Sequence, residues 1–421
     1  MGAEGSIVIA GAGQGGFQVA AALREMGHQG RIVIVGEETH LPYQRPPLSK
    51  GYLLGATDEA RAALRPESFY ADKRIELLTG RRVIALDRAH HHAALDDDRV
   101  IEYGHFVFAV GARNRPLPVR GTELRGVHCL RTLDEARALK AALETAKHAV
   151  VIGAGFIGLE VAATAMKLGV EVTVIEVADR PMARALSPQI AAIFTREHQK
   201  HGMRFMFNSQ VLHILGEAGR AVAVATVEHE RVPADVIVIG IGVQPNVEVA
   251  AAAGLDVRNG IVVDEMLLTS DPNVSAVGDC AAHPNPFADA SLVRLESVQN
   301  ATDQGRCVAA RLVGKPARYA NVPWFWSDQA ELKLQIAGLT QGYDQLVIRG
   351  DASGIACSAF CFKAGRLIGV ESVNRPGDHM LARRLVGQHV ALTPAQAADP
   401  TFDLKAHLAQ AAAAPATVAP P

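Results

Sequence analysis

The chain has 421 residues, enough for two or three domains, and its 49% hydrophobic and 20% charged residues are typical of a globular protein. A formal net charge of −2 excludes a global field that would attract nucleic acid or an acidic membrane, so neither is an expected partner. No apolar run reaches the roughly 20 residues of a membrane helix and no signal peptide is recognisable, so we expect a cytoplasmic protein. The five cysteines show no zinc spacing, so no metal site is predicted.

A strand, a glycine-rich turn and a helix follow one another at the N-terminus. Residues 7–9 form an apolar run typical of a buried parallel strand, and residues 17–26 have helical periodicity. Between them Gly11, Gly13 and Gly16 spell G-x-G-x-x-G. The first glycine allows a tight turn, the second lets backbone approach a pyrophosphate, and the third lets helix and strand pack closely. The stretch predicts a dinucleotide site, although glycine turns also occur without ligands.

Two acidic residues follow the next predicted strand, residues 31–35. An acid about 20 residues beyond the glycine turn is placed to accept hydrogen bonds from a ribose. We prefer Glu37 over Glu38 for this role because Glu37 is nearer to the end of the strand.

The segment 41–50 contains three prolines, which exclude a regular helix. It can hold Arg45 and Lys50 in fixed directions, and the sequence leaves open whether Lys50 is a surface lysine or points at a redox centre. Residues 56–78 are predicted to be helical. Strands are expected at residues 83–86, 100–103 and 106–110.

The opening pattern returns about 140 residues later. Residues 149–152 form a strand, and residues 159–168 form a helix. Between them Gly153, Gly155 and Gly158 complete a second G-x-G-x-x-G. Two dinucleotides on one chain imply electron transfer between them.

The acid after the second unit indicates which nucleotide binds there. Glu176 follows the strand 170–175 and can accept a bond from a ribose 2′-hydroxyl, which contributes roughly 1.5–3 kcal/mol. Its charge would repel a 2′-phosphate, and Val177 and Ala178 supply no arginine to hold one. We predict NADH over NADPH, with Arg180 close enough to keep the alternative open.

The last part of the chain predicts a third domain. Asp279, which follows a short strand, can bind a sugar or ribityl hydroxyl, or cap a helix. A helix is expected over residues 295–312, and the composition changes from Arg318 onwards. Alternating patterns there predict strands at residues 334–339, 345–349, 355–362 and 367–373, and a helix at 378–386. The Ala/Pro-rich tail from Ala409 is predicted to be disordered.

These patterns together resemble the NADH-dependent ferredoxin reductases of oxygenase systems, of the putidaredoxin reductase and biphenyl dioxygenase ferredoxin reductase type. These are glutathione-reductase-like flavoproteins. The resemblance covers the chain from Ile7 to about Leu404. Its most specific pieces are residues 45–50, 151–160, 270–272, 277–279, 296–298 and 323–329.

The resemblance implies that the first glycine loop binds FAD and the second binds NADH. The residues implied for FAD are Gly11, Gly13, Gly15, Gly16, Glu37, Arg45, Lys50, Val83, Arg131, Asp279, Val298 and Trp326. Those implied for NADH are Gly153, Gly155, Ile157, Gly158, Glu160, Glu176 and Arg184. Lys50 and Glu160 would be the catalytic pair, in which Lys50 approaches the flavin and Glu160 orients the nicotinamide. Gly15 stands where relatives often carry alanine, which should be harmless.

The resemblance also implies an α/β fold with two Rossmann-like dinucleotide-binding domains and a C-terminal α+β domain. The expected boundaries are 1–113 with 235–317 for the FAD domain, 114–234 for the NADH domain, 318–408 for the C-terminal domain, and 409–421 for the tail. Hydride would pass from NADH to FAD, and single electrons to a [2Fe–2S] ferredoxin that feeds a ring-hydroxylating dioxygenase or a cytochrome P450. Arg306 and Lys333 are possible docking residues, while Gln335 stands where some relatives carry a docking lysine.

Two alternatives share this fold. A NADH oxidase, peroxidase or disulfide reductase needs a redox cysteine near the flavin, usually after the first strand–helix–strand unit, and residues 41–50 contain none. A flavoprotein like apoptosis-inducing factor would react slowly with NADH. Fast bleaching of the flavin by NADH, with cytochrome c reduction only when ferredoxin is added, would favour the reductase.

Overall fold

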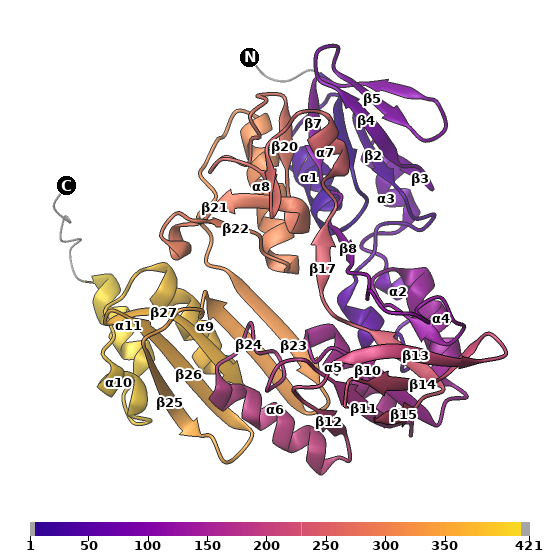
Figure 1. Ribbon diagram of the computed structural model, residues 1–421. Coiled ribbons are helices and arrows are strands. Elements are labelled where there is room, and N and C mark those ends of the chain that lie inside the picture. The colour runs from indigo at the N-terminus through magenta and orange to yellow at the C-terminus, as the bar shows by residue number, and fades with distance from the viewer. Residues whose placement is uncertain (1–4, 229, 414–421) are drawn as a thin grey trace. The chain divides into compact units, whose positions relative to one another are not determined.

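The computed structural model describes residues 5–228 and 230–413 (Figure 1). The chain divides into two compact units, each built from segments far apart in the sequence. The first unit comprises Met1–Leu117, His128–Glu144 and Ile241–Asn321, and the second comprises Pro118–Val127, Thr145–Gly240 and Val322–Pro421. In the described part of the chain, every helix is too short or too polar to cross a membrane.

A five-stranded parallel sheet forms the centre of the first unit. Its order is β20 (Val274–Ala276), β7 (His105–Phe108), β1 (Ile7–Ala10), β2 (Ile32–Gly36) and β3 (Ile75–Thr79). β1 lies between two partners, with Ile9 paired to Ile34 on one side and to Val107 on the other. Every residue of β1 is buried, which explains the unbroken apolar run in the sequence.

Two helices of the first unit, α1 (Gln14–Glu25) and α8 (Val298–Leu312), pack against each other (Figure 1). Their approach is close at Gly305, where an added Cβ would lie 3.0 Å from the Cβ of Gln18 and 3.1 Å from the carbonyl oxygen of Gly15. The helix predicted over residues 17–26 is confirmed. The predicted helix 295–312 begins three residues later than expected, at Val298.

The prediction of one helix over residues 56–78 is only partly right, because the helix is interrupted and its last residues form a strand. The segment holds two short helices, α2 (Glu59–Ala62) and α3 (Glu67–Asp72), and then turns into the edge strand β3. Pairing of Ile75–Thr79 with β2 decides the conformation there, because tertiary contact overrides local preference.

Smaller elements complete the first unit. Three consecutive antiparallel strands form a meander: β4 (Val83–Asp87), β5 (His92–Leu95) and β6 (Val100–Glu102). The other strands are β8 (Ala112–Asn114), β17 (Val243–Pro245), β18 (Val257–Arg258), β19 (Gly260–Val262), β21 (Ala281–Pro284) and β22 (Leu292–Val293). The helices are α4 (Leu133–Leu143), α7 (Glu248–Ala252), η1 (Pro46–Ser49), η2 (Gly278–Cys280) and η3 (Pro286–Ala288).

The second unit contains a sheet with the order β12 (Arg204–Met206), β11 (Glu171–Ile175), β10 (His148–Ile152), β16 (Val236–Ile239) and β9 (Val127–His128). Its helices are α5 (Phe156–Lys167) and α6 (Pro188–Lys200). A three-stranded antiparallel sheet is formed by β13 (Val211–Glu217), β14 (Arg220–Thr226) and β15 (Arg231–Pro233). The strand–glycine–helix–strand order repeats that of the first unit, as the sequence predicted.

An antiparallel sheet ends the second unit. Its order is β23 (Trp324–Gln329), β24 (Leu332–Gly338), β27 (Arg366–Val373), β26 (Ala356–Lys363) and β25 (Gln345–Asp351). The helices α9 (Pro376–Gly387), α10 (Pro394–Ala398) and α11 (Leu404–Ala413) follow or flank it, and α9 lies against β24 and β27 (Figure 1). The four predicted strands and the helix over 378–386 are confirmed.

The structure corrects the prediction for the tail and leaves the predicted domain boundaries untested. The tail expected to be disordered from Ala409 is helical as far as Ala413, and residues 414–421 lie outside the described residues. The second nucleotide fold and the C-terminal sheet share one compact unit, in which buried hydrogen bonds join Ser187 to Glu371 and Ser327 to Glu160. The division into three domains stays a prediction.

Candidate functional site

The first glycine loop has the geometry of a phosphate cradle. Gly11 has φ +114°, and a Cβ added there would lie 2.2 Å from the carbonyl oxygen of Ala109. A Cβ on Gly16 would lie 1.9 Å from the carbonyl oxygen of Gly11, so both positions require glycine. Around Gly13, by contrast, an added Cβ would meet no described atom within 4 Å. The loop is thus tight where it must turn and open where a pyrophosphate would lie.

The second loop repeats this arrangement. Gly153 has φ +100°, and a Cβ added at Gly158 would lie 2.3 Å from the carbonyl oxygen of Gly153. The middle glycine, Gly155, is again open, since its Cβ would meet only the Gly240 carbonyl oxygen, at 3.9 Å, among the described atoms. In both loops the middle glycine is the N-cap of the helix.

The N-termini of α1 and α5 are suited to bind anions. In the part of the chain that the structure describes, neither helix has a side-chain cap or an acidic residue in its first turn. Their first N–H groups and the positive end of the helix dipole therefore favour a phosphate. The loop geometry and these helix ends fit two dinucleotides, one for each loop.

The two acids predicted to bind ribose differ in their contacts. Glu176 follows β11, and its carboxylate accepts hydrogen bonds from the backbone N–H of Ala154 at 2.7 Å and of Ala178 at 2.8 Å. This fixes the carboxylate beside the second glycine loop. Glu37 follows β2, is largely exposed, and has the Arg82 guanidinium 3.7 Å away. Both acids thus stand at the predicted strand ends, but only Glu176 is held by the loop.

The proline-rich segment is fixed by two residues to which the sequence analysis gave no role, Glu38 and Tyr43. Arg45 donates to the Glu38 carboxylate at 2.7 Å and to the carbonyl oxygen of Arg131. The Tyr43 hydroxyl donates to Glu38 at 2.6 Å and accepts from the N–H of Leu133, and burial raises its pKa. Glu38 is therefore an anchor of this segment, and its signal in the sequence was its position beside Glu37.

Lys50 directly follows the short helix η1, within the segment that these contacts hold. Its ammonium lies 3.5 Å from the hydroxyl of Ser49, and its side chain is partly buried. Two prolines at the start of η1 restrict the backbone that leads to Lys50.

Arg131 and Asp279 form an ion pair at 2.8 Å in the first unit. The Arg131 Nε is buried and finds no hydrogen-bond partner among the described residues. Since a buried donor without a partner is costly, it marks a place where a ligand acceptor would be bound. The side-chain oxygen of Gln304 accepts a hydrogen bond of 2.7 Å from the N–H of Gly278, the residue before Asp279. Arg131 and Asp279 were both predicted FAD contacts, and the structure brings them together.

The other FAD candidates of the first unit lie on three different elements. Val298 is the first residue of α8, whose N-cap Ser297 accepts from the N–H of Asn300 at 3.0 Å. Val83 is the buried first residue of β4. Gly15 is buried in α1, where an added Cβ would lie 3.3 Å from Val277.

The second unit holds a buried carboxylate close to the glycine loop. Glu160 lies in α5, is 3% exposed, and accepts a hydrogen bond of 2.7 Å from the hydroxyl of Ser327 on β23. Ile157, in the first turn of α5, is 46% exposed. Arg184 is exposed in the turn before α6. Ser327 was not a predicted site residue, although it lies next to Trp326.

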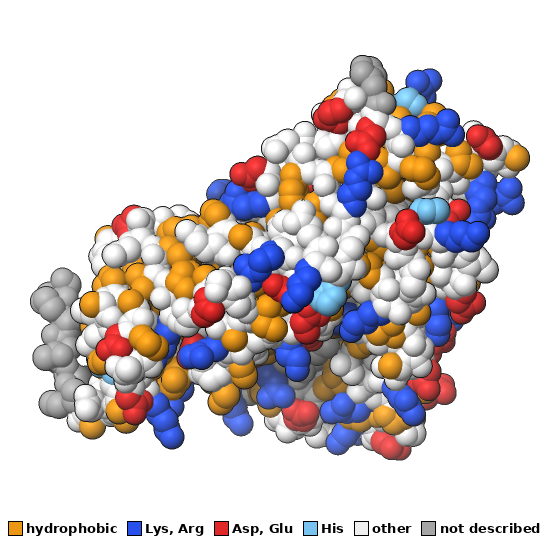
Figure 2. All heavy atoms as spheres, turned by 90° about the horizontal axis from the view of Figure 1, so that it is seen from below, with side chains coloured by type: hydrophobic (Ala, Val, Ile, Leu, Met, Phe, Trp, Pro, Cys, Tyr) orange, Lys and Arg blue, Asp and Glu red, His pale blue; other side chains and the backbone are white. Residues whose placement is uncertain are grey.

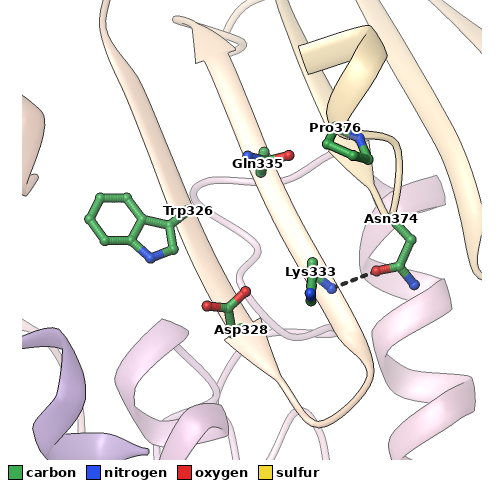
Figure 3. Close-up of a pocket in the computed structure, with 6 residues that line it drawn as sticks. All are labelled: Trp326, Asp328, Lys333, Gln335, Asn374 and Pro376. Carbon is green, nitrogen blue, oxygen red and sulfur yellow. Dashed lines mark hydrogen bonds between the residues drawn. The ribbon is translucent and has the colours of Figure 1, made fainter. Parts of the chain in front are cut away.

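Trp326 borders a cavity of about 570 Å³ on one face of the C-terminal sheet (Figure 3). Two cross-strand pairs of β23 and β24 line it, Trp326 with Gln335 and Asp328 with Lys333. The N–H of Lys333 donates to the side-chain oxygen of Asn374 at 2.9 Å (Figure 3). The Trp326 ring also packs on Trp324, with 5.5 Å between ring centroids.

The possible docking residues are exposed. Arg306 lies on α8 in the first unit, and Lys333 lies on β24 in the second. On the face shown in Figure 2, basic and acidic side chains alternate. In the sequence, positions 294–333 contain six basic and four acidic residues, a small basic excess.

All five cysteines belong to the described residues, and all are free thiols: Cys129, Cys280, Cys307, Cys357 and Cys361. Burial raises the pKa of Cys280, the neighbour of Asp279, to about 11, so it is a neutral thiol near pH 7. This chemistry does not suit a thiol relay. Among residues 5–228 and 230–413, no group of three or more His, Cys, Asp or Glu is placed to hold a metal ion.

Two dinucleotide folds and an antiparallel C-terminal sheet define a flavoprotein-type oxidoreductase that uses two nucleotides. Residues 5–305 match the family described as pyridine nucleotide-disulphide oxidoreductase, and residues 324–408 match that described as reductase C-terminal. The chain is 53% identical over 405 residues to rhodocoxin reductase of Rhodococcus erythropolis, which covers 96% of this chain and 95% of that protein.

Solved structures give the same result. The ferredoxin reductase for the CYP199A2 system from Rhodopseudomonas palustris matches with a TM-score of 0.93 and 50% identity, over 95% of this chain and 99% of that one. A chain of the covalent putidaredoxin reductase–putidaredoxin complex matches with a TM-score of 0.95 and 38% identity, over 97% and 99%. The chain therefore belongs to the pyridine nucleotide-disulphide oxidoreductase family, in its ferredoxin reductase branch with a reductase C-terminal domain. The predicted fold class, enzyme class and FAD and NAD cofactors are confirmed.

Proposed function

We propose that this enzyme takes hydride from NADH through bound FAD and passes single electrons to a [2Fe–2S] ferredoxin that feeds an oxygenase. The observation that carries the proposal is the pair of glycine loops with the same geometry, each open at its middle glycine and each followed by an uncapped helix N-terminus. Names of relatives, such as the putidaredoxin reductase in complex with putidaredoxin, support an iron–sulfur partner.

The first unit would hold FAD. Gly11, Gly13, Gly15 and Gly16 leave room for its pyrophosphate, Glu37 would bind its ribose, and the helix end at Val298 would face the pyrimidine part. The Arg131–Asp279 pair would bind polar groups of the FAD, with the Nε of Arg131 as a donor. Arg45 and Val83 complete the contacts proposed for the first unit, and Trp326, in the second unit, stays a predicted flavin contact. When bound, FAD supplies the exchange between a two-electron donor and a one-electron acceptor.

The second unit would hold NADH. Gly153, Gly155, Ile157 and Gly158 surround the proposed pyrophosphate site, with Arg184 as a further phosphate contact. Glu176, fixed by two backbone N–H groups, would accept from the ribose 2′-hydroxyl and repel a 2′-phosphate, which favours NADH over NADPH. Glu160 would orient the nicotinamide together with Lys50. Holding reactants in a fixed geometry is the main contribution of the chain to the reaction.

We assign the three functional domains with the predicted boundaries: 1–113 with 235–317 for FAD, 114–234 for NADH, and 318–408 for the C-terminal domain. Arg306 of the first unit and Lys333 of the second are each proposed to contact the ferredoxin. A cytoplasmic location is proposed because NADH is the electron donor and the five thiols are unpaired.

The test uses purified protein, NADH and a panel of [2Fe–2S] ferredoxins. We expect a yellow protein whose flavin is bleached rapidly by NADH, with cytochrome c reduction only when ferredoxin is added. Fast turnover that depends on peroxide or a disulfide would support the oxidase or disulfide reductase class, and slow bleaching would support the class of apoptosis-inducing factor. A protein that is colourless and does not bind added FAD would refute the proposal.

If docking is electrostatic, ferredoxin reduction should weaken as salt rises while flavin reduction by NADH stays constant. An absence of salt dependence in both steps would contradict a role for Arg306 and Lys333.

A further inference from the structure

The strand β23 presents different side chains to its two faces. Trp326 and Asp328 line the cavity on one face (Figure 3). Because side chains alternate along a strand, Ser327 and Gln329 point to the opposite face, and both are completely buried there. The cavity and the site proposed for the second nucleotide leave these two polar residues unexplained, and buried polar groups need partners.

These two residues join a chain of hydrogen bonds within the second unit. The ring Nε2 of His198 lies 2.9 Å from Oε1 of Gln329, and Nε2 of Gln329 donates to the hydroxyl of Ser327 at 3.2 Å. The Ser327 hydroxyl in turn donates to Oε1 of Glu160 at 2.7 Å. The exposed fractions of His198, Gln329, Ser327 and Glu160 are 2%, 0%, 0% and 3%.

The donors of this chain all point the same way. A carboxylate only accepts, so Ser327 must donate its single proton to Glu160. The amide N–H₂ of Gln329 faces Ser327, which leaves the amide oxygen to accept from His198. Burial lowers the pKa of His198, so its ring is neutral near pH 7 and carries its N–H on Nε2. The polarity of each bond therefore reinforces the next one, ending at the carboxylate.

We propose that Ser327 is a positioning residue, and that the chain from His198 through Gln329 and Ser327 fixes the Glu160 carboxylate for the nicotinamide. The inference rests on the proposed function, in which Glu160 orients the nicotinamide. Without Ser327 the Glu160 carboxylate would lose the hydrogen bond to Oε1, and its orientation towards the nicotinamide would be less restricted.

The test compares Ser327→Ala with Ser358→Ala in the holoenzyme. Ser358 is a matched control, since it is a fully buried serine of the same sheet whose hydroxyl bonds a different carboxylate, that of Asp378, at 2.9 Å. Stopped-flow reduction of the flavin by NADH should slow about tenfold in Ser327→Ala and stay unchanged in Ser358→Ala. NAD⁺ affinity, measured by calorimetry on the oxidised protein, should weaken only in Ser327→Ala. Ser327→Thr, which keeps the hydroxyl, should recover most of both effects.

A double-mutant cycle tests whether Ser327 acts through Glu160. If it does, Ser327→Ala should add no further slowing to Glu160→Ala. Equal slowing in the two serine variants, or additive effects with Glu160→Ala, would overturn the inference while the proposed function stands. Flavin reduction that is unaffected by Glu160→Ala would instead refute the proposed role of Glu160.

A second variant covers the case in which Ser327→Ala does not fold. Gln329→Leu keeps the serine hydroxyl but removes the amide that orients it. We expect flavin reduction about threefold slower, smaller than for Ser327→Ala because the direct bond to Glu160 remains. An unchanged rate of flavin reduction in folded Gln329→Leu would contradict the proposed role of Gln329 and His198 in fixing Glu160.

Discussion

The two glycine loops have nearly the same backbone but different surroundings. In both, a Cβ on the third glycine would collide with the first glycine's carbonyl oxygen, at 1.9 Å for Gly16 and 2.3 Å for Gly158. The residue before the third glycine differs between the loops. In the first loop it is Gly15, which is buried in α1 next to Val277, and in the second it is Ile157, which is 46% exposed on α5. The loops teach that sequence motifs set the turn, and that neighbouring elements decide which side chains the turn tolerates.

The acids after the two loops differ in the same manner. Glu176 is bound to two backbone N–H groups, while Glu37 is exposed with Arg82 3.7 Å away. The second loop thus has a carboxylate held by backbone N–H groups, whereas the acid after the first loop is exposed. Four experiments test this comparison.

The largest effect is expected from Gly16→Ala and Gly158→Ala. The Cβ of either alanine would collide with backbone, which costs about 3 kcal/mol or more. If the first loop binds FAD, Gly16→Ala should yield protein with little flavin, while Gly158→Ala should keep its flavin and lose NADH affinity about tenfold or more. The ratio of flavin to protein absorbance and the KM for NADH measure this.

Gly377→Ala is the control for these variants, because an added Cβ there meets no described atom within 4 Å. Equal loss of flavin in Gly16→Ala and Gly158→Ala would show that the loops do not divide the two nucleotides as proposed.

The second experiment compares how burial of histidines in the two units makes the free energy of unfolding depend on pH. Burial lowers the pKa of His105 to about 3 and of His283 to about 4 in the first unit, and of His379 to about 4 in the second. The unfolded chain, with histidine pKa values near 6.5, binds more protons below that pH. The free energy of unfolding should therefore fall as pH drops from about 6.5 towards 4, by up to about 1.4 kcal/mol per pH unit for each histidine.

Urea unfolding at pH 7.5 and pH 5 measures this loss. His283→Gln should flatten the dependence, because it removes one of the rings that is buried neutral. A free energy of unfolding that is constant over this range would contradict the neutral burial of these rings. Burial also lowers the pKa of His28 in the first unit and of His198 in the second. With three such histidines against two, the first unit should lose more stability in acid.

The third experiment replaces each of the two acids by glutamine. Glu176→Gln removes the charge that would repel a 2′-phosphate, so the preference for NADH over NADPH, as a ratio of kcat/KM values, should fall about tenfold. Glu37→Gln is the matched control and should leave this ratio unchanged. If NADPH is already used as well as NADH by the unmodified enzyme, the proposed role of Glu176 is wrong.

The smallest effect is expected for Gly15→Ala. Its Cβ would lie 3.3 Å from Val277 and 3.8 Å from the Cβ of Ala301, so a shift of a few tenths of an ångström suffices. Thermal unfolding should show a change of about 1 kcal/mol or less, with normal flavin content. Gly15→Ile, which copies the second loop, should destabilise the protein much more, because α8 covers this position. Equal stability of the two variants would contradict the close packing of α1 and α8.

Local patterns in the sequence predicted much of the fold and of the candidate site. Both loops, their flanking strands and helices, and the four long C-terminal strands depend on spacing between neighbouring residues, which a sequence displays directly. The strand Ile75–Thr79 was predicted as helix because its pairing with β2 involves residues over 40 positions away.

Only the tertiary structure decided which polar groups meet. Glu38 anchors Arg45, Arg131 pairs with Asp279, and Ser327 reaches Glu160 across 167 positions of sequence. No local periodicity encodes such contacts, since a buried carboxylate is satisfied by whichever donor the packing brings to it. The sequence by itself determined two nucleotide cradles and a C-terminal sheet, and the packing of that sheet brought the Ser327 hydroxyl to Glu160.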